Sequence, residues 1–196
     1  MTLHPFPRQS RIRWRRLDVP GREESCIERT LDGWRLRGEL EVEEAGAKAR
    51  LRYAIECDSV WRTRAALVEG EAGGDPIRFA LAADGEGRWT RDGVLLPDLS
   101  GALDIDLAFT PATNTLAIRR LALAVGESAR VWSAWFRFPE LRLEPLEQTY
   151  TREAERRFRY RAIVDGEAFI ACLDTDVFGR VVRYDDLWEI ELETSM

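Results

Sequence analysis

Residues 103–121 have the sequence L-D-I-D-L-A-F-T-P-A-T-N-T-L-A-I-R-R-L. In the first seven residues, apolar side chains alternate with two aspartates and an alanine, which is the period of a strand with two different faces. Pro111 has no N–H to donate and interrupts that strand. Thr113 and Asn114 are good helix N-caps, and the ten residues that follow contain neither Gly nor Pro. The stretch therefore predicts a strand, a proline turn and a short helix.

The rest of the chain alternates in short segments with turn signals about every ten residues. Tight hairpins are predicted at Asp92-Gly93 and Asp165-Gly166. Residues 70–76 are predicted to form a loop, and residues 147–157 a loop or a single helical turn. The sequence therefore predicts about a dozen or more strands, and one helix whose apolar face must be buried. We therefore expect a mainly β protein, a large curved antiparallel sheet wrapped around one short helix, as a single domain over residues 1–196.

Composition excludes several functions. The net charge of −6 argues against binding nucleic acid or an anionic membrane surface. His4 is the only histidine, so histidine-based catalytic triads and histidine-rich metal sites are not expected. The three cysteines, Cys26, Cys57 and Cys172, have no metal or redox spacing and are interpreted as free buried thiols. No cofactor and no metal is expected.

Targeting and nucleotide-binding signals are also missing. No apolar segment follows the basic N-terminal residues, and no run is long enough to span a bilayer, which predicts a cytoplasmic protein without an integral membrane segment. The sequence has neither a glycine-rich phosphate loop nor a G-x-S-x-G nucleophile motif.

Asp104 and Asp106 are the sharpest candidates for a site. At positions i and i+2 of a strand, their side chains leave the same face about 7 Å apart. Two carboxylates so placed can accept hydrogen bonds from sugar hydroxyls. They could also form an acid/base pair, because inverting glycosidases need roughly 6.5–9.5 Å between carboxyl groups. Spacing alone favours a third interpretation, a solvated strand face.

Arg119 and Arg120 lie on the predicted helix. One of them is expected to pair with Asp104 or Asp106 and so fix the helix on the preceding strand; the alternative is a cationic fork for a phosphate or an acidic sugar. Thr113 and Asn114 are expected to be caps, with ligand binding as the second interpretation.

Aromatic residues are the remaining candidates. Strand tryptophans usually belong to the core, but four of the seven could offer a flat face to a sugar or a wall to an acyl chain: Trp61, Trp132, Trp135 and Trp188. Arg62 and Arg64, with Asp58, form a polar set beside the first of these.

The central stretch also carries a family resemblance. The pattern D-I-D-L-x-F-T-P-x-T-N-T-L-x-I-R-R-L resembles the signature of a bacterial family of putative glycolipid-binding proteins. Residues 51–64, Gln148 with Tyr150, and G-R-V-V-R-Y-D-D-L-W at 179–188 extend the resemblance over most of the chain. The resemblance implies a large sheet around a single helix, remotely like the half-barrel carriers of lipoproteins and lipids, an acidic pocket and a homodimer.

Together these observations favour a non-catalytic protein that binds or carries a glycolipid or a related sugar-containing amphiphile through an acidic pocket. The first alternative is a glycosidase-like enzyme that uses the paired aspartates. The second is a structural dimer without a small ligand, which predicts that no pocket large enough for a sugar ring lies near Asp106. The sequence identifies neither the lipid nor the sugar.

Overall fold

The computed structural model describes residues 3–44 and 46–191. It contains a single α-helix among these residues, α1 (Asn114–Leu121), and one short 3₁₀ turn, η1 (Pro97–Leu99). Fifteen strands make up most of the rest: β1 (Gln9–Arg16), β2 (Gly21–Arg29), β3 (Gly33–Glu44), β4 (Ala47–Asp58), β5 (Thr63–Ala72), β6 (Asp75–Ala83), β7 (Trp89–Arg91), β8 (Val94–Leu95), β9 (Asp104–Leu107), β10 (Ser128–Arg137), β11 (Arg142–Ala154), β12 (Arg157–Val164), β13 (Glu167–Thr175), β14 (Val181–Tyr184) and β15 (Trp188–Ile190).

All fifteen strands belong to one sheet, in the order β8 to β1 followed by β15 to β9. Strands β1–β8 therefore form one run of sequential neighbours and β9–β15 another. The two runs are joined where β1 pairs with β15, from Trp14 opposite Ile190 to Arg16 opposite Trp188. Every pair is antiparallel except β9 with β10, which is parallel. The predicted large curved sheet is confirmed, with the correction that it is mixed rather than purely antiparallel.

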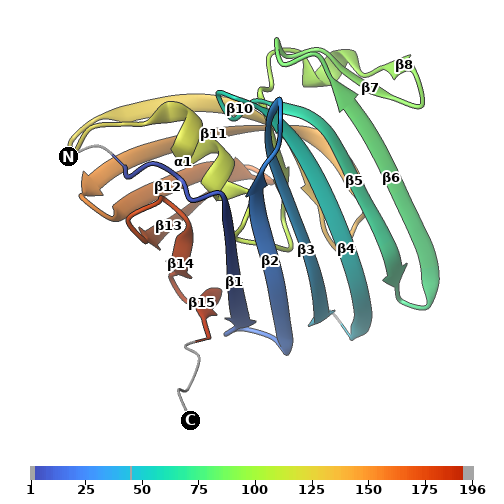
Figure 1. Ribbon diagram of the computed structural model, residues 1–196. Coiled ribbons are helices and arrows are strands. Elements are labelled where there is room, and N and C mark those ends of the chain that lie inside the picture. The colour runs from blue at the N-terminus through green and yellow to red at the C-terminus, as the bar shows by residue number, and fades with distance from the viewer. Residues whose placement is uncertain (1–2, 45, 192–196) are drawn as a thin grey trace.

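The sheet curves around α1, which lies in its concavity (Figure 1). Leu116 and Ile118 are fully buried in the core that the helix shares with the inner faces of the strands. The helix ends at Leu121 because Ala122 adopts a left-handed conformation and its N–H still reaches the carbonyl of Ile118. The predicted helix is thus confirmed, and its burial explains why an eight-residue segment is stable.

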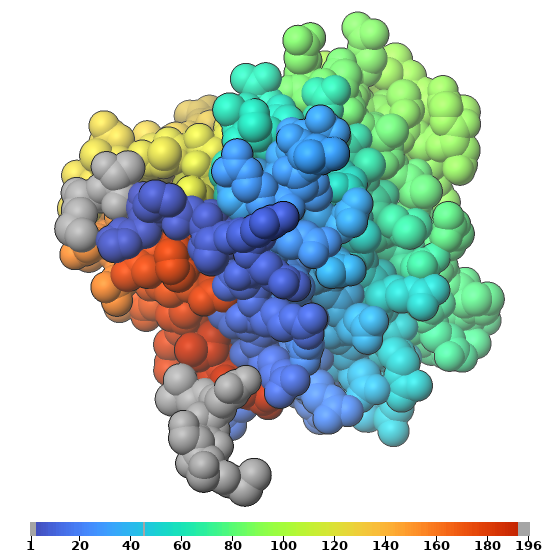
Figure 2. Space-filling view, viewed as in Figure 1, coloured from blue at the N-terminus to red at the C-terminus, as the bar shows by residue number. Residues whose placement is uncertain are grey.

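The described N-terminal residues close one side of the concavity. In Figure 2 these residues, in blue, lie against residues of the C-terminal part of the chain, in red and orange. The His4 N–H donates to the carbonyl of Val177. Phe6 packs edge-on against Trp34 with ring centroids 5.4 Å apart. At the far end of the sheet, β9 contacts the beginning of β5, because the N–H of Ile105 donates to Thr63 Oγ1.

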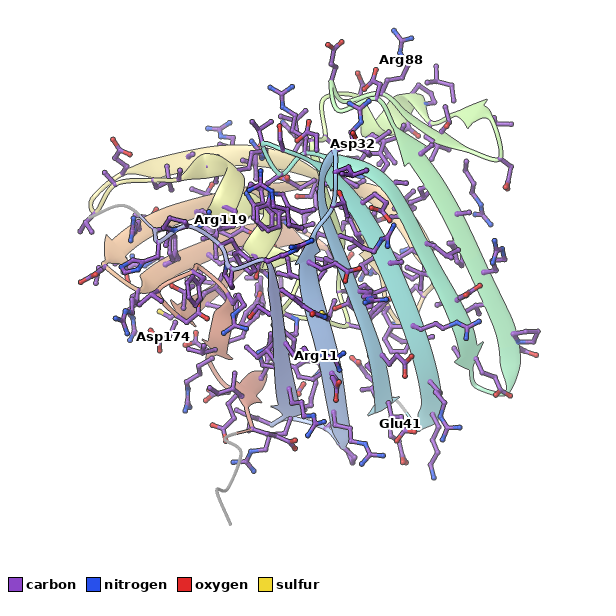
Figure 3. All side chains as sticks on the ribbon, in the orientation of Figure 1. Arg11, Asp32, Glu41, Arg88, Arg119 and Asp174 are labelled. Atoms are coloured by element: carbon purple, nitrogen blue, oxygen red, sulfur yellow. The ribbon has the colours of Figure 1, made fainter. Side chains whose placement is uncertain are left out.

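The outer face of β1–β6 is covered by arginines and glutamates, and Arg11 and Glu41 lie on these strands in Figure 3. Cross-strand ion pairs such as Arg52–Glu69 at 2.8 Å run over this face. Exposed pairs of this kind contribute little each, about 0–1 kcal/mol. They keep the outer face polar while the inner face supplies the core.

Two predicted loops are strands instead. Residues 70–76 contain only a two-residue turn, Gly73-Gly74 with positive φ, and Pro76 lies inside β6 opposite Glu71. Residues 147–154 continue β11. Its inward positions include Gln148 and the buried Arg152. Because these inward residues are polar, the alternation of apolar and polar residues that predicts a strand is absent here.

Candidate functional site

Strand β9 is buried on both sides. Ile105 and Leu107 are in the core, and Asp104 is only 1% exposed. The interpretation of the aspartates as a solvated face is therefore wrong for Asp104. The expected pair with the helix is present, because the Arg120 guanidinium on α1 binds Asp104 through Nε at 2.9 Å and through Nη2. Burial raises the pKa of Asp104, while the hydrogen bonds and charge of Arg120 lower it.

Asp106 has a different environment two residues further along. Its Oδ1 accepts a hydrogen bond from the Thr113 hydroxyl at 3.1 Å, and its Oδ2 accepts one from the side-chain amide of Gln148. Both donors are neutral. Burial is the main reason that the pKa of Asp106 is raised from 3.8 to about 6; the negative charge of Asp104 adds to it.

Thr113 and Asn114 occupy the predicted helix start, but their side chains do not cap it. Thr113 is the N-cap residue without a side-chain capping bond, and its hydroxyl binds Asp106 instead. The Asn114 Oδ1 accepts a hydrogen bond from the Tyr150 hydroxyl at 2.9 Å. The Gln148 Oε1 in turn accepts one from Ser133 at 2.9 Å. Side chains thus tie the start of α1 to β9 and β11, and Gln148 in turn links β11 to β10.

A pocket of about 220 Å³ opens beside this network. We call it the Asp106 pocket. Its polar wall contains Asp106, Thr110 and Asn114, and its remaining walls are largely aromatic and aliphatic: Trp135, Tyr160, Phe169, Tyr184 and Trp188, with Leu146, Val164 and Leu187. The volume is below the roughly 300–1,000 Å³ that encloses a drug-sized ligand. It suits a single sugar ring or a group of similar size, with the rest of a larger ligand outside.

Three buried tyrosines lie close enough to Asp106 for its negative charge to affect their pKa values. Burial raises the pKa of Tyr150, Tyr160 and Tyr184 well above the usual range, and the charge of Asp106 raises each further. All three phenols therefore stay protonated at neutral pH. They remain able to donate hydrogen bonds.

Thr110 links the pocket to a second buried carboxylate. Its hydroxyl donates to Glu23 Oε1 at 2.8 Å, and the Tyr53 hydroxyl donates to the same oxygen at 2.6 Å. Glu23 Oε2 is buried with no hydrogen-bond partner among the described residues. Burial raises the pKa of Glu23 from 4.5 to about 7 against the opposing effect of these two hydrogen bonds.

The other predicted site residues lie away from the Asp106 pocket. Arg119 points toward the N-terminal segment, donates to the carbonyls of His4 and Phe178, and lies over Trp61 at 5.3 Å (Figure 3). Trp61 is buried and stacked on Trp34 with centroids 4.5 Å apart. Arg62 donates to the carbonyl of Gly85, and Arg64 to that of Asp84. None of these four lines the pocket.

Of the tryptophans considered from sequence, Trp135 and Trp188 line the pocket, whereas Trp132 is 45% exposed on the opposite face of β10. Sequence reasoning missed Tyr160, Phe169 and Tyr184. They occupy inward positions on three neighbouring strands, β12, β13 and β14, where aromatic side chains are usually part of the core.

Larger hollows of about 530, 770 and 400 Å³ lie elsewhere, along β1–β6. They are lined mainly by arginines and glutamates of the outer face, and many of these pair with each other, as Arg50 does with Glu41 at 2.9 Å. These hollows lack the enclosed aromatic walls of the Asp106 pocket, so we do not assign the site there.

Residues 11–189 match the model of a family described as "Putative glycolipid-binding". The chain belongs to this family. Among solved structures, a DUF1089 family protein from Pseudomonas aeruginosa, determined at 1.80 Å resolution, is 32% identical with a TM-score of 0.76. The similarity covers 85% of this chain and 91% of that one. No curated protein matches the sequence.

In this member of the putative glycolipid-binding family, no helix in residues 3–44 or 46–191 is long and apolar enough to cross a membrane. The same residues contain no group of three or more His, Cys, Asp or Glu side chains that could hold a metal ion. The arrangement that a glycosidase-like acid/base pair of Asp104 and Asp106 requires is not present, because Asp104 is bound to Arg120 and does not line the pocket.

Proposed function

We propose that the protein binds the sugar head group of a glycolipid, or of a related amphiphile, in the Asp106 pocket without chemical conversion. The observation that carries the proposal is the combination of a part-buried carboxylate with aromatic walls in a cavity the size of one sugar ring. Aromatic faces stack on the apolar faces of sugars, and Asp106 and Asn114 can hydrogen-bond the hydroxyls. Membership of the glycolipid-binding family supports the same ligand class.

The acyl part of such a ligand would leave through the apolar side of the pocket. Val164, Phe169 and Leu187 line that side. Phe169 is 36% exposed near the tip of the β12–β13 hairpin, whereas Ile163 and Ile170 lie on the opposite face of these strands. The Phe169 ring therefore extends the apolar wall of the pocket to the surface, where a hydrocarbon chain can contact it.

Native mass spectrometry after incubation with a bacterial lipid extract tests this proposal. A discrete retained mass, absent from the protein-free control, is expected, and its fragmentation identifies the head group. Trp135→Ala should weaken retention at least about tenfold, a loss of about 1.4 kcal/mol, because it removes a pocket wall. Trp132→Ala, on the opposite face of the same strand, should retain ligand like the wild type. Equal retention by both variants would place any bound lipid elsewhere and refute the site.

We also propose a homodimer on the family resemblance and, from the sequence itself, a cytoplasmic location and a single domain over residues 1–196. Sedimentation velocity at micromolar concentration tests the first of these. A species with the mass of one chain at all concentrations would contradict it.

A further inference from the structure

The charged side chains that line the Asp106 pocket are paired with one exception; Glu23, which also lacks a cationic partner among the described residues, lies behind Thr110 and does not line the pocket. Arg16 lines the pocket, but its guanidinium binds Asp18 through two hydrogen bonds of 2.7 and 3.0 Å, and Glu44 lies 3.5 Å from it. Arg120 is bound to Asp104. Asp106 has only the neutral partners described above. Among the described residues that form this site, it is the carboxylate left without a cationic partner.

Aromatic rings gather beside that carboxylate. Tyr160, Phe169 and Tyr184 form a three-ring cup, with centroids 6.0, 6.2 and 6.4 Å apart and ring planes inclined by 56–69°. Trp135 and Trp188 add two more aromatic walls. The face of an aromatic ring carries partial negative charge and attracts cations, most strongly where water is excluded.

A neutral ligand and a cationic ligand would affect this site differently. A neutral sugar that displaces water from the pocket leaves the Asp106 charge uncompensated in a drier environment, which is costly. An ammonium group supplies the missing counter-charge and also interacts favourably with the aromatic faces. An anionic head group such as a phosphate would be repelled.

We propose that the Asp106 pocket selects a head group that carries a positively charged nitrogen, such as an amino sugar, over the neutral sugar of the same size. This inference rests on the proposed function and narrows its ligand class. Asp106 receives the ammonium, while the aromatic cup holds the remaining faces of the group.

The experiment compares three soluble probes below their micelle concentrations at pH 7: octyl β-D-glucopyranoside, its 2-amino-2-deoxy analogue and its 2-acetamido-2-deoxy analogue. Calorimetric titration measures each affinity. The amino glycoside should bind at least about tenfold more tightly than either neutral probe. Asp106→Asn should equalise the amino and neutral glycosides. Asp174→Asn, a carboxylate on the outer side of β13 that does not line the pocket, should keep the preference.

A second measurement on the wild-type protein does not depend on whether Asp106→Asn folds. Lowering the pH from 7.5 to 5 protonates Asp106, whose pKa is about 6, so the preference for the amine should shrink. Asp104 is paired with Arg120, and the three tyrosines remain neutral over this range. Glu23 binds Thr110 in the pocket wall and has a pKa of about 7, so it also takes up a proton over this range. The scan is therefore repeated on Glu23→Gln, which should show the same loss of preference.

The outcomes separate the two proposals. Equal affinity for the amino and neutral glycosides overturns the inference but leaves glycoside binding at the pocket intact. A preference that survives in Asp106→Asn also overturns it, because the carboxylate is then not its source. Binding of none of the three probes, together with no retained lipid mass, contradicts the proposed function itself.

Discussion

Glu23→Gln tests how strongly the sheet buries a carboxylate beside the pocket wall. In the folded protein the pKa of Glu23 is about 7, against 4.5 for an exposed glutamate. At about 1.4 kcal/mol per pKa unit, this displacement corresponds to about 3 kcal/mol. Because the folded state holds the proton more tightly than the unfolded state, the contribution of Glu23 to stability is fully present below pH 4.5. It is lost as the pH rises through 7.

Urea denaturation between pH 4 and 8 provides the assay. The free energy of unfolding of the wild type, minus that of Glu23→Gln, should fall by about 3 kcal/mol across this range. The glutamine variant changes hydrogen bonds from Tyr53 and Thr110 as well, but that offset does not depend on pH. The titration of Asp106 is present in both proteins and cancels in the difference.

Glu24→Gln is the matched control, because its carboxylate is the next one along β2 but lies on the exposed outer face, paired with Arg13. The free energy of unfolding of the wild type, minus that of Glu24→Gln, should show no comparable fall between pH 5 and 8. If the profiles of Glu23→Gln and the wild type run parallel, Glu23 is not buried as a costly charge and the reasoning is refuted.

Three further predictions concern the core. Arg120→Met should destabilise the protein by about 3–5 kcal/mol, since it leaves the Asp104 charge buried without a partner, and adding Asp104→Leu should recover part of that loss in the same urea assay. Gly38→Ala should cost about 1–3 kcal/mol in thermal or urea unfolding, because the new Cβ would lie 2.5 Å from the Tyr53 ring; unchanged stability would contradict this packing. Cys57 is buried and burial raises the pKa of its thiol, so it should resist a thiol reagent in the native protein and react in urea; rapid native labelling of that residue would argue against its position.

The local elements could be predicted from sequence because their signals are local. The hairpin turns at Asp92-Gly93 and Asp165-Gly166 have positive φ at both positions, as the dipeptides indicated. The helix followed from the cap-like residues and the absence of breakers after Pro111. Its pairing with the preceding strand followed from burial, since two arginines could not both remain unpaired inside a sheet.

The pocket could be predicted only in part. Asp106, Trp135 and Trp188 were candidates, but Tyr160 and Tyr184 join them through the register of β11–β14, which no local pattern specifies. The set around Trp61 was wrong because Trp61 and Arg62 lie in the turn between β4 and β5 rather than in a continuous strand, and Trp61 has a positive φ of 71°. Trp61 therefore stacks on Trp34, while Arg62 and Arg64 donate to backbone carbonyls.

The pairing of β1 with β15 has a consequence for synthesis of the chain on the ribosome. Strands β1–β8 can form as successive hairpins while they emerge, but β1 receives its second neighbour only after residues 188–190 have been made. Until then, the nascent half-sheet presents β1 as a free edge, a template for pairing with other chains. The five arginines between residues 8 and 16 discourage such pairing by charge repulsion. The pairing of β1 with β15 therefore has to follow the synthesis of residues 188–190, and it also brings Trp188 to the Asp106 pocket.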